Sequence, residues 1–281
     1  MILAAYMVVG FTMVGVYAVG MLRGRLNRYH KLGFTYPFVV AAIAAPLQLL
    51  TGDRSARGVA SAQPQKFAAM ELVATTHSHV TEWIGGIYQN GHVYWGIGVP
   101  DLDSILVGSS PDTTVVGWDA VPPDLRAPFP SLLHIAFDLM VGTGTLLLVL
   151  VAWQAFWSWR RRRLLTTRWF LLPMAAAGAL AILAMESGWI VTEVGRQPWT
   201  VYGYLKTADA VTPVTSIGVT LVTVLILYLV LAVVTIGITV AMGRHWRRVD
   251  ESAAAGRDGP PPRPDRLPRG AQAGGSVGED R

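Results

Sequence analysis

Five long apolar stretches alternate with polar segments along the chain, and each is long enough to cross a lipid bilayer. A helix needs about 20 consecutive apolar residues to span roughly 30 Å of hydrocarbon. The pattern therefore predicts an all-α integral membrane protein with five transmembrane helices. The expected spans are Met1 to Leu22, Gly33 to Thr51, Ser131 to Trp159, Trp169 to Val194 and Val214 to Met242.

Polar segments divide these spans into four parts. Residues 1–51 hold the first two helices, and residues 52–130 form a long loop between the second and third helices. Residues 131–242 hold helices three to five. Residues 243–281 are basic and rich in proline and glycine, and such a composition predicts a disordered tail.

Basic residues gather beside three of the span ends and predict the orientation of the chain. Cytoplasmic loops of membrane proteins carry an excess of lysine and arginine. Five crossings place all three clusters on one side, so we expect a cytoplasmic C-terminus and an outward-facing long loop. An outward-facing start at Met1, without a basic segment ahead of the apolar run, predicts that further spans precede it rather than a signal peptide. The clusters are Arg23, Arg25, Arg28 and Lys31; Arg160 to Arg163 with Arg168; and Arg244, Arg247 and Arg248.

Composition agrees with a membrane protein and excludes several classes of site. Hydrophobic residues make up 52% of the chain and charged residues only 15%, whereas soluble domains carry about 25% charged residues. The chain has no cysteine, which excludes disulfides, thiolate-bound metals and haem attached through cysteine. The net charge of +5 lies mostly beside the spans, so we expect no nucleic-acid partner.

Ionisable side chains stand at the end of the fourth apolar span, where a bilayer makes them costly. Glu186, Trp189 and Glu193 are spaced i, i+3 and i+7 and share one helical stripe. Gln197 falls near the same stripe, and Pro198 ends the regular hydrogen bonding. Intramembrane carboxylates usually face a bundle interior and perform a function, so the stripe indicates a cofactor site or a proton site.

Three motifs resemble subunit I of the cytochrome bd quinol oxidases. Residues 188–199, GWIVTEVGRQPW, with 205–210, LKTADA, are similar to the family's signature segment. Residues 65–71, QKFAAME, resemble its quinol-loop motif, and residues 134–142, HIAFDLMVG, resemble the segment carrying a methionine ligand of haem. The resemblance implies quinol oxidation on the outward face and electron transfer through three haems to oxygen, giving water and a proton gradient across a bacterial-type plasma membrane.

The resemblance implies haem-binding roles for four residues. Met140 would ligate the low-spin haem b, and Glu193 would ligate the high-spin haem b. Arg196 would hold a haem propionate, and His134 would contact a propionate or the quinol loop. From the residues alone, the simpler interpretation of Met140 is an ordinary core residue, whereas Glu193 is equally the ion-pair partner of Arg196 at i+3.

The same resemblance implies catalytic roles for four more residues. Lys66 would donate a hydrogen bond to quinol, and Glu71 would accept one and take a proton. Glu186 would serve a proton path, and Trp189 would lie between the two b haems. The alternatives are exposed loop charges for the first two, a buried protonated carboxyl for Glu186 and plain packing for Trp189.

The resemblance covers only the second half of the family's subunit, which normally has nine spans. The histidine ligand of haem d belongs to the first four spans, and the histidine partner of the low-spin haem would fall just ahead of Met1. We therefore expect the chain to need the N-terminal half of subunit I or a separately encoded equivalent, together with oxidase subunit II, membrane quinol and oxygen. The alternative is a non-catalytic membrane scaffold or quinone-binding fragment. A transporter is a weaker alternative.

Three histidines of the long loop form another candidate site. His77, His79 and His92 could bind zinc, because an HxH pair with a third histidine supplies three nitrogen ligands. The polar surroundings favour the simpler interpretation that all three are solvated loop side chains.

Overall fold

The computed structural model describes residues 1–214 and 217–257, and for 246–257 it describes the backbone only. The chain divides into two units, Met1–Val211 and Thr212–Arg281, which are considered separately. The five expected spans all appear as helices that are long and apolar enough to cross a membrane.

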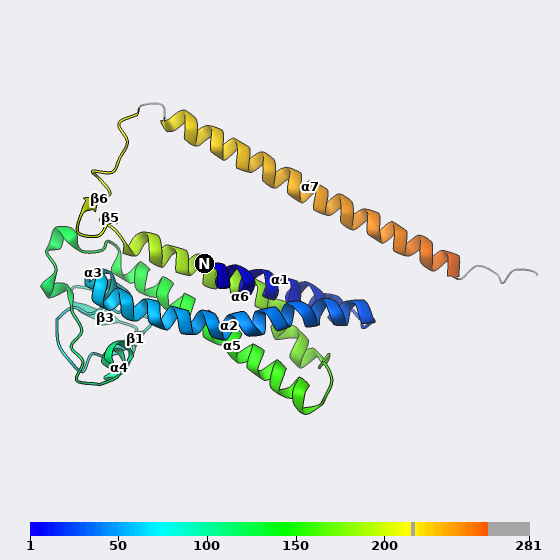
Figure 1. The fold of residues 1–281 in the computed structure, drawn as a ribbon, viewed down its shortest axis with the longest axis horizontal. Coiled ribbons are helices and arrows are strands. Elements are labelled where there is room, and N and C mark those ends of the chain that lie inside the picture. The colour runs from blue at the N-terminus through cyan, green and yellow to red at the C-terminus, as the bar shows by residue number, and fades with distance from the viewer. Residues whose placement is uncertain (215–216, 258–281) are drawn as a thin grey trace, which may run out of the picture. The chain divides into compact units, whose positions relative to one another are not determined.

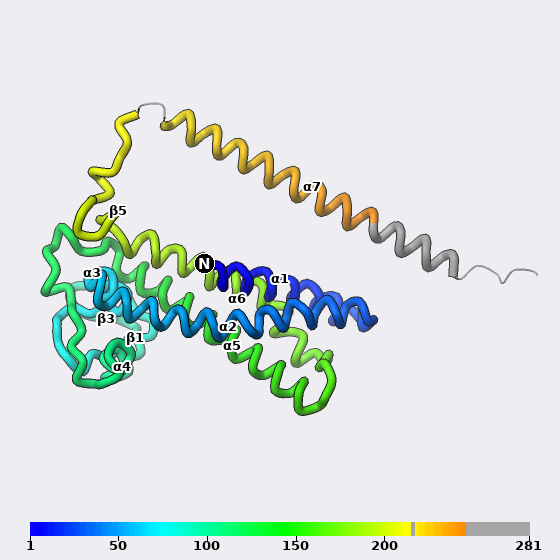
Figure 2. Tube along the Cα trace, in the orientation of Figure 1, coloured from blue at the N-terminus to red at the C-terminus, as the bar shows by residue number. Residues whose placement is uncertain are grey.

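Four long helices pack side by side in the first unit (Figures 1 and 2). The first two are joined at one end by a short basic turn, and the last two are joined at the same end. Contacts run from α1 to α2 and α6, and from α5 to α2 and α6. The helices are α1 (Ile2–Leu22), α2 (Arg28–Ala62), α5 (Pro130–Arg160) and α6 (Arg168–Gly195).

Small residues allow these helices to approach closely, as is common where lipid rather than water surrounds a bundle. A Cβ atom at Gly178 of α6 would lie 2.9 Å from Thr12 Cα of α1. A Cβ atom at Gly10 of α1 would lie 3.1 Å from Ala41 Cβ of α2. Larger side chains at these glycines would therefore push the helices apart.

The loop between α2 and α5 folds into a small layer at one end of the bundle, instead of remaining an irregular connection. A hydrophobic core separate from the one between the long helices lies beneath this loop and includes Phe67, Met70, Trp118 and Leu133. The elements are α3 (Pro64–Met70), β1 (Glu82–Ile84), β2 (Ile87–Gln89), β3 (His92–Tyr94), β4 (Ile97–Val99), α4 (Leu102–Gly108), and the 3-10 turns η1 (Trp118–Ala120) and η2 (Pro123–Leu125).

Three short antiparallel ladders make the protein mostly helical rather than all-α. β1 pairs with β4, with Glu82 opposite Val99, and β2 pairs with β3, with Tyr88 opposite Val93. A third ladder follows α6, where β5 (Trp199–Val201) pairs with β6 (Leu205–Lys206). The sequence did not indicate these strands, because an alternation of apolar and polar residues over only three positions cannot be distinguished from a loop.

The second unit contains α7 (Ile217–Arg257). Its segment Ile217–His245 has a mean hydropathy of 2.9 and contains the fifth expected span. The helix continues past Gly243, where the sequence predicts a change to a disordered tail, and residues 250–257 are helical. The rest of the expected tail, 258–281, lies outside the described residues.

The helix α2 continues past Thr51, the expected end of the second span, and ends at Ala62. Polar residues such as Asp53 and Arg57 end the apolar run but form an i, i+4 ion pair at 3.2 Å, which suits a helix. The helix thus projects beyond the apolar band before Pro64 begins α3.

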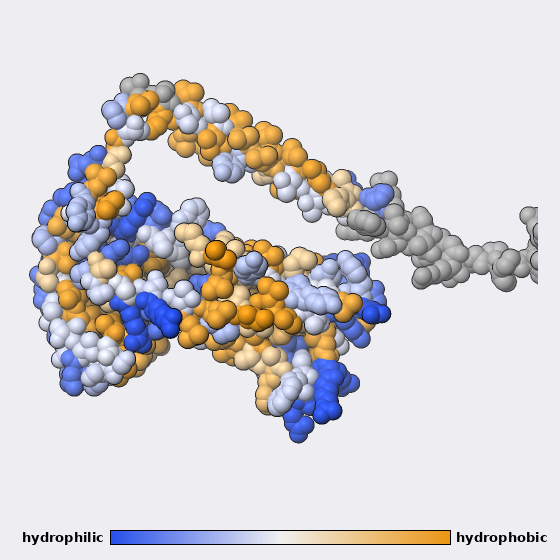
Figure 3. All heavy atoms as spheres, viewed as in Figure 1, coloured by the Kyte–Doolittle hydropathy of each residue, from blue (hydrophilic) through white to orange (hydrophobic). Residues whose placement is uncertain are grey.

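The surface of the four-helix unit is apolar around its middle and polar toward its ends (Figure 3). Large side chains on α1, α2, α5 and α6 remain exposed in this middle region, among them Val16, Ile43, Val149 and Ile182. A lipid-facing bundle has this distribution, since hydrocarbon imposes no penalty on apolar surface.

Candidate functional site

Lys66 lies on the small helix α3, Glu71 is the residue directly after its last turn, and both side chains are buried. Lys66 is 8% exposed and Glu71 is 4% exposed. Pro64 starts the helix and Glu71 ends it, while α2, α5 and α6 pack around it. The alternative that these two residues are exposed loop charges is therefore wrong.

The side chain of Lys66 reaches the end of α6 that carries the signature segment. A Cβ atom at Gly195 would lie 2.9 Å from Lys66 Cε, so the missing side chain makes room for the lysine. Burial lowers the pKa of the Lys66 ammonium, the carboxylate of Glu193 opposes this change, and the guanidinium of Arg196 adds to it. Two motifs far apart in sequence thus meet at one place.

Glu71 faces two other buried carboxyl groups from different elements of the loop. Glu82 of β1 and Asp103 of α4 each place an oxygen within 4.8 Å of the others. Glu82 is 9% exposed and Asp103 is 1% exposed. Three carboxylate oxygens at this spacing have the donor chemistry of a site for a hard cation or for shared protons.

Their surroundings favour the protonated forms. Burial, followed by the charges of Glu82 and Asp103, raises the pKa of Glu71 well above its ordinary value. Burial raises the pKa of Asp103 to about 7, with a further contribution from Glu82. Burial also raises the pKa of Glu82, although the hydrogen bond from Glu71 acts in the opposite direction.

His134 fastens this loop to α5. The side chain is fully buried, with Nδ1 2.6 Å from the carbonyl oxygen of Met70 and Nε2 3.1 Å from that of Gly85. Nε2 also lies 3.3 Å from the carboxylate of Asp138. All three partners are acceptors, an arrangement that only a doubly protonated ring satisfies completely. The expected contact with the loop is present, whereas a contact with a haem propionate stays a prediction.

Met140 lies on the side of α5 that meets α6. A Cβ atom at Gly188 would lie 2.9 Å from Met140 Sδ, so the glycine leaves a notch beside the thioether. Nothing lies within 4 Å of the corresponding positions at Gly142 and Gly144 among the described residues. A half-buried thioether beside glycine and open helix surface has the chemistry to hold a haem iron, and this role of Met140 stays a prediction.

The stripe predicted on α6 exists, and in this unit it faces outward. Glu186, Trp189 and Glu193 are all exposed, with Trp189 at 62%. Glu193 pairs with Arg196 at 2.7 Å, so the ion-pair alternative is realised in this chain. An exposed carboxylate within an apolar helix fits a site that further helices or a haem would cover.

The loop histidines do not converge on one another. His77 and His92 are exposed, and His79 contacts the carboxylates of Asp101 and Asp112 at 3.0 and 3.2 Å. Within 1–214 and 217–257, no group of three possible metal ligands includes a histidine. The structure therefore favours solvated histidines over a zinc site.

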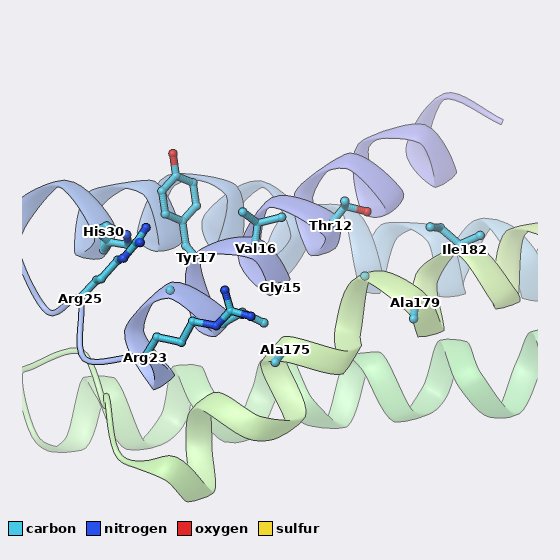
Figure 4. Close-up of a pocket in the computed structure, with 13 residues that line it drawn as sticks. Thr12, Gly15, Val16, Tyr17, Arg23, Arg25, His30, Ala175, Ala179 and Ile182 are labelled. Atoms are coloured by element: carbon cyan, nitrogen blue, oxygen red, sulfur yellow. The ribbon is translucent and has the colours of Figure 1, made fainter. Parts of the chain in front are cut away.

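A cavity lies elsewhere, between α1 and α6 toward the basic end of the bundle (Figure 4). It measures about 550 Å³, and Arg23, Arg25 and His30 stand at its rim. It contains none of the residues expected to contact quinol, so its size alone does not identify the functional site.

Glu82, Asp103 and Asp138 are the site residues that sequence reasoning missed. Glu82 and Asp103 lie 11 and 32 positions from Glu71 in the chain, and only the loop fold joins them. The one available signal was Asp138, which stands four positions after His134 and would share its helical face.

Comparison with known proteins agrees with these motifs. The family profile described as cytochrome bd terminal oxidase subunit I matches residues 1–246. A Bacillus subtilis (strain 168) protein, provisionally assigned as a cytochrome bd menaquinol oxidase subunit I, is 34% identical over 224 residues, covering 78% of this chain and 50% of that protein. A second protein of this organism, cytochrome bd ubiquinol oxidase subunit 1, is 30% identical over 225 residues, covering 74% of this chain and 47% of its own length.

A solved structure gives the same result for the fold. The bd oxidase from Geobacillus thermodenitrificans matches with a TM-score of 0.74 and 32% identity, covering 86% of this chain and 56% of that one. The chain thus spans about half the length of the relatives it matches. On the extent of the profile match and the similarity to these proteins, the chain belongs to the cytochrome bd terminal oxidase subunit I family.

Proposed function

We propose that this chain supplies the quinol-binding loop and two haem-iron ligands of a quinol:oxygen oxidoreductase. The observation that carries the proposal is the burial of Lys66 and Glu71 on one short helix, next to the end of α6 that bears Glu193. A buried lysine on a short helix and a buried carboxyl at the end of the same helix suit a diol substrate, which needs a donor and an acceptor. Quinol is such a substrate.

Each residue has a separate role in quinol binding. The Lys66 ammonium donates to one quinol oxygen, and its lowered pKa reduces the desolvation cost of docking an uncharged ring beside it. Glu71 accepts a hydrogen bond from the hydroxyl and is the first acceptor of its proton. Leu133 and Val191, both buried beneath α3, belong to the apolar core that supports this helix.

Met140 and Glu193 would hold the iron of the low-spin and high-spin b haems, and Arg196 would neutralise a propionate. Bound haem would supply one-electron redox chemistry, with methionine ligation raising the reduction potential. The ion pair joins Nη2 of Arg196 to Oε2 of Glu193, so Oε1 would be the oxygen that binds iron, and other N–H groups of the guanidinium would reach the propionate. Trp189 and Glu186, exposed on the same stripe, would line the space between the haems and a proton path.

The working oxidase would contain more than this chain. We infer that helices equivalent to the remaining half of its relatives, in the same polypeptide or a separate one, supply the histidines for the low-spin haem and haem d. Subunit II, membrane quinol and oxygen complete the assembly in a multi-pass plasma-membrane enzyme. The quinol loop would face outward and the C-terminus the cytoplasm.

The test compares two lysine variants in an assembly that contains the remaining half. Lys66→Met should lower kcat/KM for quinol oxidation about 100-fold, with the reduced-minus-oxidised haem spectrum unchanged. Lys31→Met, an exposed lysine near the basic end of α2, is the matched control and should retain full activity. Equal activity in the two variants would refute the assignment of Lys66.

A non-catalytic scaffold or quinone-binding fragment is the alternative function. The exposed stripe on α6 argues for covering groups, but a scaffold would also bury it against a partner. Optical spectra of the chain alone and with the remaining half separate the two. We expect no quinol oxidase turnover from the chain alone and haem b and haem d bands in the completed assembly. No haem in either sample would establish the scaffold.

A further inference from the structure

We propose that Glu82 is the proton-accepting partner of Glu71 in the quinol site, and that the two carboxyl groups share one proton at rest. This inference rests on the proposed function, because it extends the path of the proton that quinol releases. It assigns a role to a residue outside all three sequence motifs.

The first argument is the contact between the two groups. One carboxyl oxygen of Glu71 and one of Glu82 lie within 4.8 Å of each other, and the interaction between the two groups raises the pKa of Glu71 and opposes the rise of the pKa of Glu82, which places the proton on Glu71. Ionised carboxylates only accept hydrogen bonds, so one proton must lie between the two groups. Glu71 thus already carries a proton, and it can accept another from quinol only if its own proton moves to Glu82.

The second argument is the state of the remaining oxygen atoms. Oε2 of Glu71 is buried without a hydrogen-bond partner among the described residues, so a lone pair remains on it to accept a proton. Asp103 is 1% exposed, neither of its carboxyl oxygens has a partner, and it offers one of them within 4.8 Å of the pair. Oε2 of Glu82 is a fourth buried oxygen without a partner. Because buried polar atoms are rarely left without partners, this group of four oxygens indicates a site where protons bind.

The third argument is the charge around the pair. Asp103 of α4 and Asp138 of α5 face it, and His134 of α5 lies on the Glu82 side, where it opposes the rise of the pKa of Glu82. No lysine or arginine among the described residues forms an ion pair with Glu71, Glu82 or Asp103. Full ionisation would therefore gather negative charge in a buried space, whereas one shared proton halves the charge of the pair.

The transfer is balanced in protons and bonds. The O–H bond of quinol breaks as an O–H bond forms at Oε2 of Glu71. The O–H bond that Glu71 holds toward Glu82 breaks as an O–H bond forms on Glu82. The pair changes from a net charge of −1 to zero, and it returns to −1 when Glu82 releases the proton.

His134 positions the pair without taking part in this transfer. Its contact with the carbonyl oxygen of Met70 fixes the residue before Glu71, and its contact with that of Gly85 fixes the turn that follows β1. Both carboxyl groups are therefore held against the same point of α5.

The first experiment uses the full chain and infrared difference spectroscopy of protonated carboxyl groups. Glu71→Gln should remove one C=O band, and Glu82→Gln should shift that band, because an amide replaces the carboxylate that accepts the hydrogen bond. Asp112→Asn, with an 83% exposed side chain, is the matched control and should leave the band unchanged. An unchanged band in Glu82→Gln would overturn the shared proton. So would loss of the band on adding Ca²⁺ or Mg²⁺ alone, which would indicate a cation site.

The second experiment measures quinol oxidation against pH in the completed assembly. Glu82→Gln should lower kcat at least about 10-fold, keep KM within about twofold, and abolish the pH dependence carried by the pair. Glu82→Asp, which restores an acid, should recover part of kcat. A wild-type pH profile in Glu82→Gln would overturn the inference.

Glu71→Gln distinguishes this failure from failure of the proposed function. If Glu71→Gln stops quinol oxidation while Glu82→Gln changes nothing, only the partner assignment is wrong. If Glu71→Gln also keeps full activity, the quinol site itself is wrong.

Discussion

Replacing Asp103 by asparagine should remove a pH-dependent weakness of the loop. Burial raises the pKa of this carboxyl from its ordinary value of 3.8 to about 7 in the folded state. Below the pKa of Asp103 in the opened loop, the carboxyl is protonated in both the closed and the opened state, and the closed loop has its full stability. This stability is lost as pH rises toward the folded pKa, since the unfolded carboxyl ionises first.

The magnitude follows from these two pKa values. The difference between 3.8 and about 7 corresponds to about 4 kcal/mol in total. Linkage then predicts that opening of the loop becomes about 2 kcal/mol, or about 30-fold, easier between roughly pH 5.5 and pH 8.5. Asp103→Asn is isosteric and cannot ionise, so its loop should lose this part of the pH dependence and keep only the parts that come from the raised pKa values of Glu71 and Glu82.

Hydrogen exchange at Val80 measures this opening. The Val80 amide donates to Oγ of Ser104 at 3.0 Å, next to Asp103, and the contact is buried. The ratio of exchange rates in the two proteins at each pH cancels the intrinsic pH dependence of exchange. If Val80 protection changes equally with pH in wild type and Asp103→Asn, the attribution to Asp103 is refuted.

Three further changes test other parts of the site. Gly188→Ala places a Cβ atom 2.9 Å from Met140 Sδ. We expect a displaced low-spin haem band in the completed assembly, with under about 1 kcal/mol lost in stability. An unchanged optical spectrum would argue against Met140 as ligand. His134→Ala leaves three acceptors without their donor and should cost about 3 kcal/mol of loop stability in thermal unfolding, a result that an unchanged transition would contradict. Glu193→Ala should remove high-spin haem absorbance and spare the low-spin haem, whereas equal loss of both would indicate a folding defect.

The sequence by itself determined the membrane class and the five spans. Hydrocarbon thickness sets a length of about 20 apolar residues, and this signal is local and strong. The helical stripe of Glu186, Trp189 and Glu193 was equally predictable, because the period of a helix fixes which residues share a face. Motif resemblance identified the family, which the profile match confirms.

Helix ends were less predictable, because apolarity reports contact with lipid rather than helix formation. The backbone of α2 stays helical past Thr51 as far as Ala62, although the side chains change from mostly apolar to mostly polar after Thr51. For the same reason, α7 continues beyond Met242, the expected end of the fifth span.

Only the tertiary structure decided which charges are buried and which meet. Lys66 and Glu71 read as ordinary loop charges until α3 is packed against α5 and α6. Glu82 and Asp103 come to Glu71 through short strands and a seven-residue helix that have weak local signals. Proximity between residues far apart in the chain depends on how the loop folds over the bundle, and this depends on packing rather than on any local periodicity.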